Sequence, residues 1–170
     1  MTIRNLDAIF RAKSVVLIGA SSRPHSVGSV IAKNLLAGGF AGTILAVNPK
    51  YEQVSGHICY RDVASLPSAP DLAVICTPPE TIPGLIHELG ERGTKGAIVI
   101  SAGFRELSTV RGSMLERAML EAGRPYLMRI IGPNCVGALS TPIGLNASFA
   151  PGNAIKGGVV PREFIPAVKK

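Results

Sequence analysis

The chain contains no tryptophan, and aromatic residues make up only 5% of its 170 positions. Its lysines and arginines are scattered rather than grouped in blocks. Proteins that bind nucleic acid combine clustered basic residues with aromatic side chains that stack on bases, so this composition argues against a nucleic-acid surface. The formal net charge of +7 nevertheless favours anionic partners. It fits a polyanionic small molecule, and it fits equally a basic surface without a binding role.

Cysteines and long apolar runs are also scarce. No two of the three cysteines (Cys59, Cys76 and Cys135) form a C-x-x-C pair, which argues against a disulfide framework. No apolar run approaches the roughly 18 residues of a membrane helix. The first 13 residues, MTIRNLDAIFRAK, lack the apolar core of a signal peptide and predict a short amphipathic helix. We therefore expect a cytoplasmic protein without membrane contact.

Short β-branched segments alternate with segments of helical periodicity along most of the chain. Buried strands are predicted over residues 15–18, 43–47, 71–76, 96–100 and 127–131. Helices are predicted to begin near Ser26, to cover residues 82–89, and to cover residues 108–122 with Val110, Met114, Leu115, Ala118 and Met119 buried. Residues 51–70 are less regular, with a turn at Ser55-Gly56 and a short helical piece at 62–66. This alternation predicts an α/β fold with a Rossmann-like, doubly wound parallel sheet of five or more strands.

The composition of the sequence changes after about residue 137, and its hydrophobic periodicity ends. Residues 140–161 are rich in proline, glycine and asparagine without a clear period, and the last residues are charged. We therefore expect an N-terminal helix over residues 1–13, a Rossmann-like domain over 14–140, and an irregular C-terminal extension over 141–170. This extension is too short for a second domain.

Small, rigid or polar residues follow each predicted strand. In open parallel sheets, ligands bind outside the carboxyl ends of the strands, near the point where the strand order reverses. A helix that follows such a loop offers N–H groups and a dipole that attract phosphate. The sequence therefore predicts a ligand crevice formed by Gly19, Ala20 and Ser21; Asn48, Pro49 and Lys50; Cys76, Thr77 and Pro78; Ser101, Ala102 and Gly103; and Gly132, Pro133 and Asn134.

Two departures from the dinucleotide-binding pattern narrow the ligand. Gly19 and Gly28 are separated by a longer, polar insert than G-x-G-x-x-G allows, and this insert carries Arg23 and His25. An NAD site also has an acidic residue after the second strand, which binds the ribose hydroxyls. In this chain the second strand is followed by Asn48, Pro49 and Lys50, none of which is acidic. A lysine there favours a nucleotide with an additional ribose phosphate. The residues alone leave coenzyme A (CoA) and NADP open, with NAD less well supported.

The motifs at these strand ends resemble the CoA-binding domain of the NDP-forming (ADP-forming) acyl-CoA synthetases. The same superfamily includes the succinyl-CoA synthetase alpha subunit and acetyltransferases fused to a synthetase-like region. The resemblance covers roughly residues 7–150. It depends on VVLIGAS (15–21), VNPK (47–50), DLAVICTP (71–78), SAGF (101–104), GPNCVG (132–137) and GLNASFAP (144–151).

The resemblance implies roles for individual residues. Ser21, Ser22, Arg23, Ser26 and Val27 would line the first loop against the CoA phosphates, and Lys50 would approach the phosphate on the adenosine ribose. Thr77 and Pro78 would border the path of adenine and pantetheine, with Ser101 and Ala102 beside them. The thiol end would lie near Pro133, Asn134 and Cys135.

The family is one of acid–thiol ligases, whose chemistry passes a phosphoryl group through a histidine in a second domain and uses an ATP-grasp domain. None of His25, His57 and His87 matches that histidine, and neither of those domains is recognisable here. The resemblance therefore implies that this chain binds CoA or acyl-CoA without turnover, and that residues 141–170 are a truncated start of the second domain. We expect no catalytic residue and no metal site.

Alternatives remain open beside this interpretation. One is a fragment of an NAD(P)-binding oxidoreductase, and another is a stand-alone CoA-sensing or regulatory subunit. A separate ATP-grasp or ligase chain is an expected partner. The sequence leaves the oligomeric state open, a homodimer included.

Overall fold

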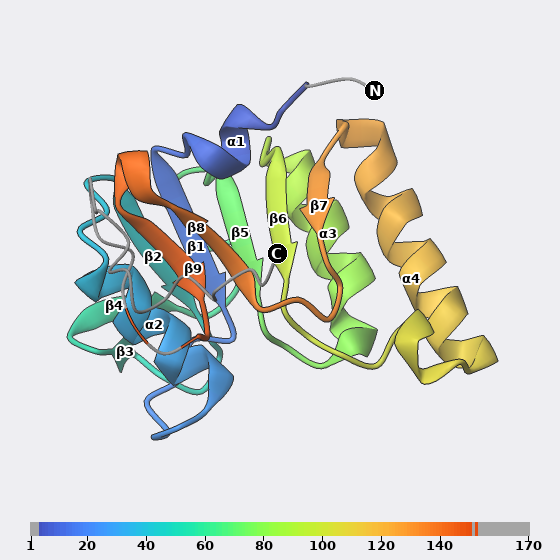
Figure 1. The fold of residues 1–170 in the computed structure, drawn as a ribbon, viewed down its shortest axis with the longest axis horizontal. Coiled ribbons are helices and arrows are strands. Elements are labelled where there is room, and N and C mark those ends of the chain that lie inside the picture. Colours follow the sequence, from blue (N-terminus) through green and yellow to red (C-terminus); the bar gives the residue numbers. More distant parts are fainter. Residues whose placement is uncertain (1–3, 151, 153–170) are drawn as a thin grey trace, which may run out of the picture.

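A seven-stranded sheet forms the centre of the molecule (Figure 1). The computed structural model describes residues 4–150 and 152. The strand order is β3-β4-β2-β1-β5-β6-β7, and every neighbouring pair is parallel except β3 with β4. The bounds are β1 Ser14–Ile18, β2 Thr43–Val47, β3 Gln53–Val54, β4 His57–Tyr60, β5 Leu72–Ile75, β6 Gly96–Val99 and β7 Arg129–Ile131. The predicted Rossmann-like parallel sheet is confirmed.

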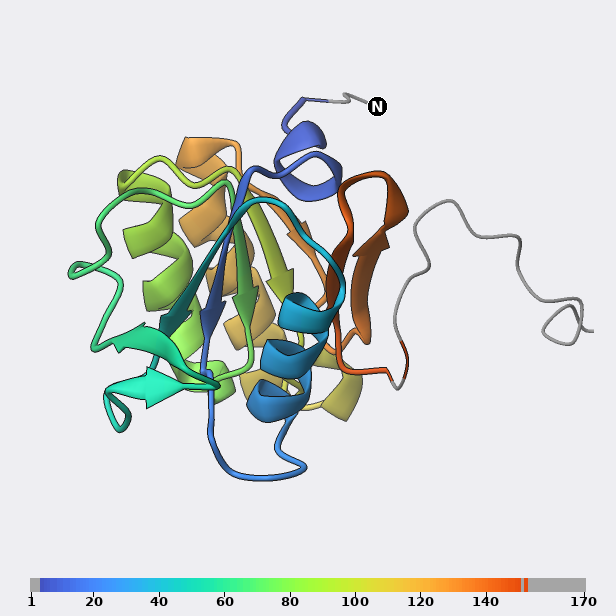
Figure 2. The same cartoon turned by 90° about the vertical axis from the view of Figure 1, so that its left-hand side faces the viewer.

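Helices cover both faces of this sheet (Figure 2). On one face, Ile31 and Leu35 of α2 (Val27–Ala37) pack with Val15, Leu17 and other strand residues. On the other face, residues of α3 (Ile82–Glu91) and α4 (Val110–Gly123) pack on the opposite side chains of the same strands. Because successive side chains of a strand point to opposite faces, each central strand is buried on both sides, which explains its unbroken apolar run. A short helix, α1 (Asp7–Phe10), adds the buried Ile9 to the first of these layers.

Side-chain caps explain where two of the helices begin. Ser26 and Thr109 have extended backbones, and their side chains accept hydrogen bonds from the backbone N–H groups of Ser29 and Gly112, respectively. These bonds satisfy N–H groups that the first turn of a helix leaves without partners. The predicted start of α2 near Ser26 is therefore confirmed.

Two strands that were not predicted, β3 and β4, lie in the irregular segment 51–70. β3 and β4 form a hairpin whose turn residues, Ser55 and Gly56, have φ angles of 52° and 79°. Positive φ at both positions is typical of a tight two-residue hairpin turn, so the predicted turn is correct. The predicted helical piece at 62–66 is wrong. Ser65 instead donates hydrogen bonds from its N–H and hydroxyl to Asp62 Oδ1 (2.8 Å) and Asp62 O (2.9 Å), which closes a local turn.

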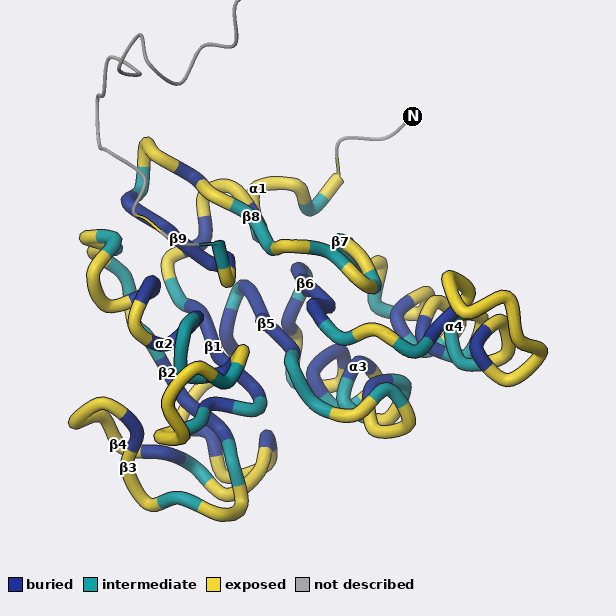
Figure 3. Tube along the Cα trace, turned by 60° about the horizontal axis from the view of Figure 1, so that its bottom comes forward, coloured by how far each residue is buried: buried dark blue, intermediate teal, exposed yellow. Residues whose placement is uncertain are grey.

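The inward face of α4 also differs from the prediction. Met119 is fully buried, but Val110 and Met114 are 79% and 66% exposed. Figure 3 shows that much of α4, at the edge of the molecule, is exposed. Buried glycines, Gly112 and Gly123, take part of the inward face instead, because the backbone of α4 approaches its neighbours closely there.

The segment after residue 137 is more regular than predicted. β8 (Gly137–Ser140) and β9 (Leu145–Ser148) form an antiparallel hairpin, joined by a 3₁₀ turn over Thr141–Ile143. The hairpin packs beside α2, where the buried Asn34 amide donates to the carbonyl oxygens of Ser148 (2.8 Å) and Ala150 (3.0 Å). Residues 141–150 are thus not an irregular extension. The rest of the predicted extension, apart from Gly152, lies outside the described residues.

Among the residues that the structure describes, no helix is both long enough and apolar enough to cross a membrane.

Candidate functional site

A pocket of about 730 Å³ lies at the carboxyl ends of the central strands. The chain leaves β1 toward β2 on one side, whereas β5 lies on the other side of β1, so the strand order reverses between β1 and β5. Ligand sites of open α/β sheets form at such a point. The pocket is lined by the loop between β1 and α2, the residues after β2, β4 and β5, and one face of α3.

The loop from Gly19 to Gly28 is held close to the first turn of α2. Gly19 has a φ of 93°, a backbone conformation that glycine adopts without strain. A Cβ placed on Gly28 would overlap the carbonyl oxygen of Gly19 and would lie 3.3 Å from the N atom of Ser21. The Ser21 hydroxyl also accepts a hydrogen bond from the Arg23 N–H (3.1 Å). These contacts bring small residues and the helix N-terminus together at the pocket.

Asn48 connects the first two strand ends. Its amide donates to the carbonyl oxygen of Ala20 (2.8 Å), and its Oδ1 accepts a hydrogen bond from the N–H of Lys50 (2.9 Å). The Asn48 side chain, in the region where NAD sites have an acid, therefore joins the β1–α2 loop to the segment after β2. Lys50 itself is exposed and lines the pocket.

Charged residues of both signs surround the pocket. Arg23, Lys50 and Arg61 are exposed cations, and none of them makes an ion pair with another described residue. Hydrogen bonds from Ser65 hold the pKa of Asp62 below its usual range, so this carboxylate stays ionised. Glu88 is the second acid of the pocket and is half-buried.

Cys76 lines the pocket beside Gly19. Its Sγ lies 3.3 Å from the carbonyl oxygen of Ile18 and 3.4 Å from that of Gly19. Burial raises the pKa of this thiol to about 12. A thiol must be ionised to act as a nucleophile, so Cys76 is a packing residue at neutral pH.

Hydrogen bonds extend the site from the end of β5 across the ends of β6 and β7. The Ser101 hydroxyl donates to the carbonyl oxygen of Thr77 (2.6 Å), and the N–H of Asn134 donates to the carbonyl oxygen of Ser101 (3.0 Å). The three strand ends therefore form one continuous polar rim.

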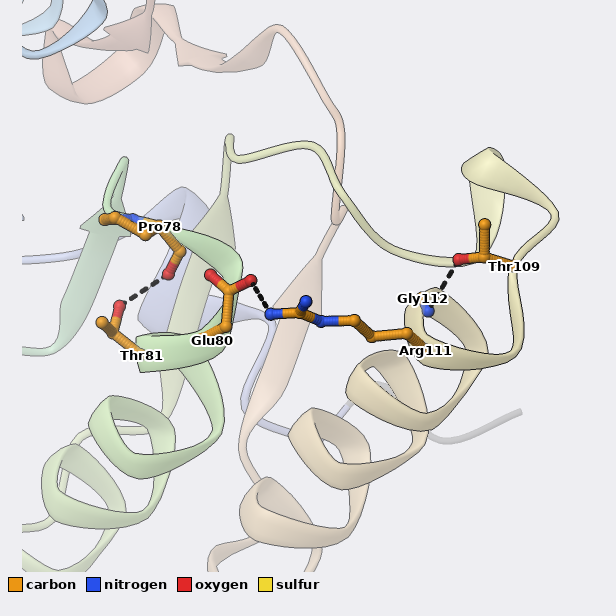
Figure 4. Close-up of polar contacts among 6 residues, drawn as sticks. All are labelled: Pro78, Glu80, Thr81, Thr109, Arg111 and Gly112. Atoms are coloured by element: carbon orange, nitrogen blue, oxygen red, sulfur yellow. Dashed lines mark hydrogen bonds and ion pairs between the residues drawn. The ribbon is translucent and has the colours of Figure 1, made fainter.

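Polar contacts within the segment between β5 and α3, and from this segment to α4, also hold it in place (Figure 4). Thr81 Oγ1 donates to the carbonyl oxygen of Pro78 (2.7 Å). Arg111, in the first turn of α4, pairs with Glu80 at 2.6 Å. Pro78 and Thr81, which line the pocket, thus belong to an anchored turn.

The structure brings most of the predicted site residues together. Eleven of them line the pocket: Gly19, Ser21, Arg23, Ser26, Val27, Asn48, Pro49, Lys50, Cys76, Thr77 and Pro78. Ala20 is fully buried, and the exposed Ser22 lies beside Gln53, so neither belongs to this lining. The residues of the β6 and β7 ends also lie outside it, on the rim: Ser101, Ala102, Gly103, Pro133 and Asn134.

Several lining residues were missed from the sequence: Tyr51, Arg61, Asp62, Val63, Thr81, Leu85 and Glu88. Three of them follow β4, a strand too short to show a pattern. Three more could have been predicted from their spacing in the sequence. Thr81, Leu85 and Glu88 stand at i, i+4 and i+7, so they lie on one face of the predicted helix.

The histidines lie away from this pocket. His25 is exposed, has a φ of 60° and borders a separate shallow hollow with Ser29 and Lys33. His57 is exposed in β4, and His87 contacts Tyr126 (3.2 Å) on the outer side of α3. Within residues 4–150 and 152, no group of three or more histidine, cysteine, aspartate or glutamate residues is arranged to hold a metal ion.

Comparisons with known proteins identify relatives of this chain. The chain is 44% identical over 154 residues to an ADP-forming acetate–CoA ligase of Methanocaldococcus jannaschii, which covers 91% of this chain and 21% of that enzyme. It is 39% identical over 157 residues to the alpha subunit of acetate–CoA ligase I of Pyrococcus furiosus (90% and 34%). The chain therefore spans about a fifth to a third of the length of these relatives.

Solved structures agree with these similarities. The apo structure of an acetyl-coenzyme A synthetase of Ca. Korarchaeum cryptofilum has a TM-score of 0.80 at 37% identity, covering 86% of this chain and 31% of that chain. The sequence also matches the model of the CoA binding domain family over residues 13–141. The chain therefore belongs to the CoA-binding domain family, and it resembles the N-terminal part of the ADP-forming acetyl-CoA synthetases.

Proposed function

We propose that this chain binds CoA or acyl-CoA in the pocket between β1 and β5, as the CoA-holding part of an ADP-forming acyl-CoA synthetase. The observation that carries the proposal is the pocket at the reversal of strand order. It combines an insert-bearing loop and a helix N-terminus with the three cations Arg23, Lys50 and Arg61. CoA carries a diphosphate and a separate ribose phosphate, so it needs positive charge at more than one place.

The β1–α2 loop and the first turn of α2 are the proposed site of the diphosphate. N–H groups at a helix N-terminus and the positive end of the helix dipole favour an anion there. Arg23 adds a guanidinium that binds phosphate oxygens in a bidentate manner. Lys50, after β2, is the proposed partner of the ribose phosphate.

The rim formed by the β6 and β7 ends is the proposed path of the pantetheine arm. Ser101 and Asn134 lie along this rim, beyond the pocket itself. Pantetheine carries amide groups, and the polar backbone of the rim offers partners for them. In this arrangement Cys135, the residue after Asn134, lies near the thiol end of CoA.

We further propose that the described residues bind CoA without reacting it. Burial raises the pKa of both Cys76 and Cys135, which keeps these thiols protonated at neutral pH. His25 borders a different hollow. The ligase chemistry then belongs to other domains or to a separate ATP-grasp chain, and a tagged copy of this chain should retain such a chain in a pull-down. A homodimer is the alternative assembly, and mass photometry distinguishes the two.

Isothermal titration calorimetry tests the proposal. We expect CoA to bind in the micromolar to millimolar range, and Lys50→Glu to weaken it by roughly 10- to 100-fold, the effect of losing a charge-assisted contact. Arg124→Glu is the matched control, because Arg124 is exposed beside β7 at the opposite end of the sheet and undergoes the same change of charge. Equal losses in both variants would show a general charge effect and would contradict the assignment of Lys50.

A second candidate function is that of a stand-alone CoA sensor. One observation favours it: a conserved hypothetical protein of Pyrococcus furiosus has a TM-score of 0.54 at 30% identity, and this chain covers 90% of that chain. A domain of this kind can thus make up most of a polypeptide. Titration with CoA, NADPH and NADH separates both CoA proposals from an oxidoreductase fragment, which would bind the nicotinamide cofactors more tightly.

A further inference from the structure

One face of α3 extends the pocket away from the phosphate-binding loop. Leu85 and Glu88 of α3, with Thr81 at its N-cap, line the pocket at i+4, i+7 and i, respectively. Ile82, Ile86 and Leu89 of the same helix are fully buried in the core. With a rise of about 1.5 Å per residue, Glu88 lies roughly 10 Å along the helix from Thr81, which sits at the rim. The pocket therefore continues from the rim down the side of α3.

Apolar residues form the walls of this extension. Val63 is fully buried, Leu85 is half-buried, and both line the pocket together with Pro78. The segment that carries Val63 packs against the end of α3, because Arg92, the C-cap residue of α3, donates hydrogen bonds to the carbonyl oxygens of Ala64 (3.3 Å) and Leu66 (2.7 Å). A flat apolar group such as a nucleobase fits between such walls.

Two carboxylates line this extension, Asp62 and Glu88, and only one of them already has a hydrogen-bond partner among the described residues. The Asp62 carboxylate accepts a hydrogen bond from Ser65 and closes a turn. The Glu88 carboxylate makes no hydrogen bond or ion pair with any residue that the structure describes, although it is half-buried. An ionised carboxylate only accepts hydrogen bonds, so a half-buried one in a ligand pocket favours a ligand group that donates.

We propose that Glu88 is a specificity-determining residue that selects adenine, by accepting a hydrogen bond from its exocyclic amine. This inference depends on the proposed binding of CoA, because adenine is the base of that ligand. Guanine and hypoxanthine carry a carbonyl oxygen at the same ring position, and that oxygen repels a carboxylate. A site built to bind a donor rejects an analogue that lacks it, since the buried acceptor is then left without a partner.

The test compares adenosine 3′,5′-bisphosphate with inosine 3′,5′-bisphosphate by calorimetry on the full chain. We expect the protein to prefer the adenosine compound by roughly tenfold or more, as is typical for a hydrogen bond to a charged group. Glu88→Gln should reduce this preference to within about threefold, because the glutamine amide donates to the inosine carbonyl. Glu91→Gln, on the same helix but outside the pocket and paired with His87, should keep the preference of the unaltered protein.

The outcomes separate this inference from the proposed function. If CoA binds but the two bisphosphates bind equally well, or if Glu88→Gln leaves their ratio unchanged, the role of Glu88 is overturned and CoA binding stands. If the folded protein binds neither CoA nor either bisphosphate, both proposals are wrong. Circular dichroism of each variant verifies that it is folded.

Discussion

Gly28→Ala is a sharp test of how the β1–α2 loop packs against α2. Alanine has a higher helix propensity than glycine, by up to about 0.5–1 kcal/mol, so propensity alone would not destabilise α2 in this variant. Here, however, the added Cβ would overlap the Gly19 carbonyl oxygen and would lie 3.1 Å from the Gly19 carbonyl carbon. These are backbone atoms, so the loop itself has to move. Overpacking of this kind costs about 1–3 kcal/mol, and we expect a net destabilisation of about 1–2 kcal/mol.

Gly84→Ala is the matched control. Gly84 is an exposed glycine in α3, and a Cβ placed there meets no atom within 4 Å. Helix propensity alone then applies, and we expect stabilisation of about 0.5 kcal/mol. The two glycines undergo the same chemical change and should shift stability in opposite directions.

Urea unfolding and thermal unfolding, each followed by circular dichroism, measure the free energy of unfolding and the melting temperature of both variants. For a chain of this size, the expected loss in Gly28→Ala lowers the melting temperature by about 2–8 °C. Binding of CoA should weaken in the same variant, because the displaced loop carries the proposed phosphate-binding N–H groups. If Gly28→Ala were as stable as Gly84→Ala, the close approach between loop and helix would be refuted.

Three further predictions concern the site and its surroundings. Burial raises the pKa of the Cys76 thiol from the ordinary 9.0 to about 12. Between pH 9 and 12 this thiol therefore ionises in the unfolded protein and stays protonated in the folded one. The free energy of unfolding falls as the pH rises through this range. This loss is about 1.4 kcal/mol at pH 10. Urea titrations at pH 7.5 and 10 should show a smaller loss in Cys76→Ala, and equal losses in the two proteins would contradict the buried thiol. Asn34→Ala should destabilise the fold by about 1–3 kcal/mol and speed hydrogen exchange in β9, because the buried Asn34 amide donates to the carbonyl oxygens of Ser148 and Ala150. Unchanged exchange would show that the hairpin packs beside α2 without these bonds. Arg111→Ala should cost less than about 1 kcal/mol and leave CoA binding intact, because the Glu80–Arg111 pair is exposed; a large loss in calorimetry would disprove this.

The sequence predicted the central sheet well because its strands are buried on both faces. Runs such as Val15–Ile18 are apolar without interruption, and small or polar residues end each of them. The same reasoning located most of the pocket, since parallel strands bring their carboxyl ends to one edge. Lys50 was placed at that edge from its position after a strand, whereas the place of Arg23 at the phosphates came from the resemblance to the CoA-binding domain.

The sequence failed where the structure depends on contacts between distant segments. β3 and β4 are two and four residues long, too short for a periodic pattern, and without them Arg61 and Val63 could not be placed at the pocket. The hairpin of β8 and β9 depends on its packing beside α2, where Asn34 lies more than one hundred residues away along the chain. The exposure of Met114 has a similar origin, because close packing at Gly112 and Gly123 fixes which face of α4 turns inward.

The most direct test of the central claim is a calorimetric titration of this protein with CoA, 3′-dephospho-CoA and NADH under the same conditions. The cationic pocket and the lysine after β2 predict that CoA binds most tightly, that dephospho-CoA binds roughly tenfold more weakly, and that NADH binds more weakly still. The difference between CoA and dephospho-CoA should shrink in Lys50→Ala. If NADH bound as tightly as CoA, or if CoA bound no better than an unrelated mononucleotide, the account of this pocket as a CoA site would be contradicted.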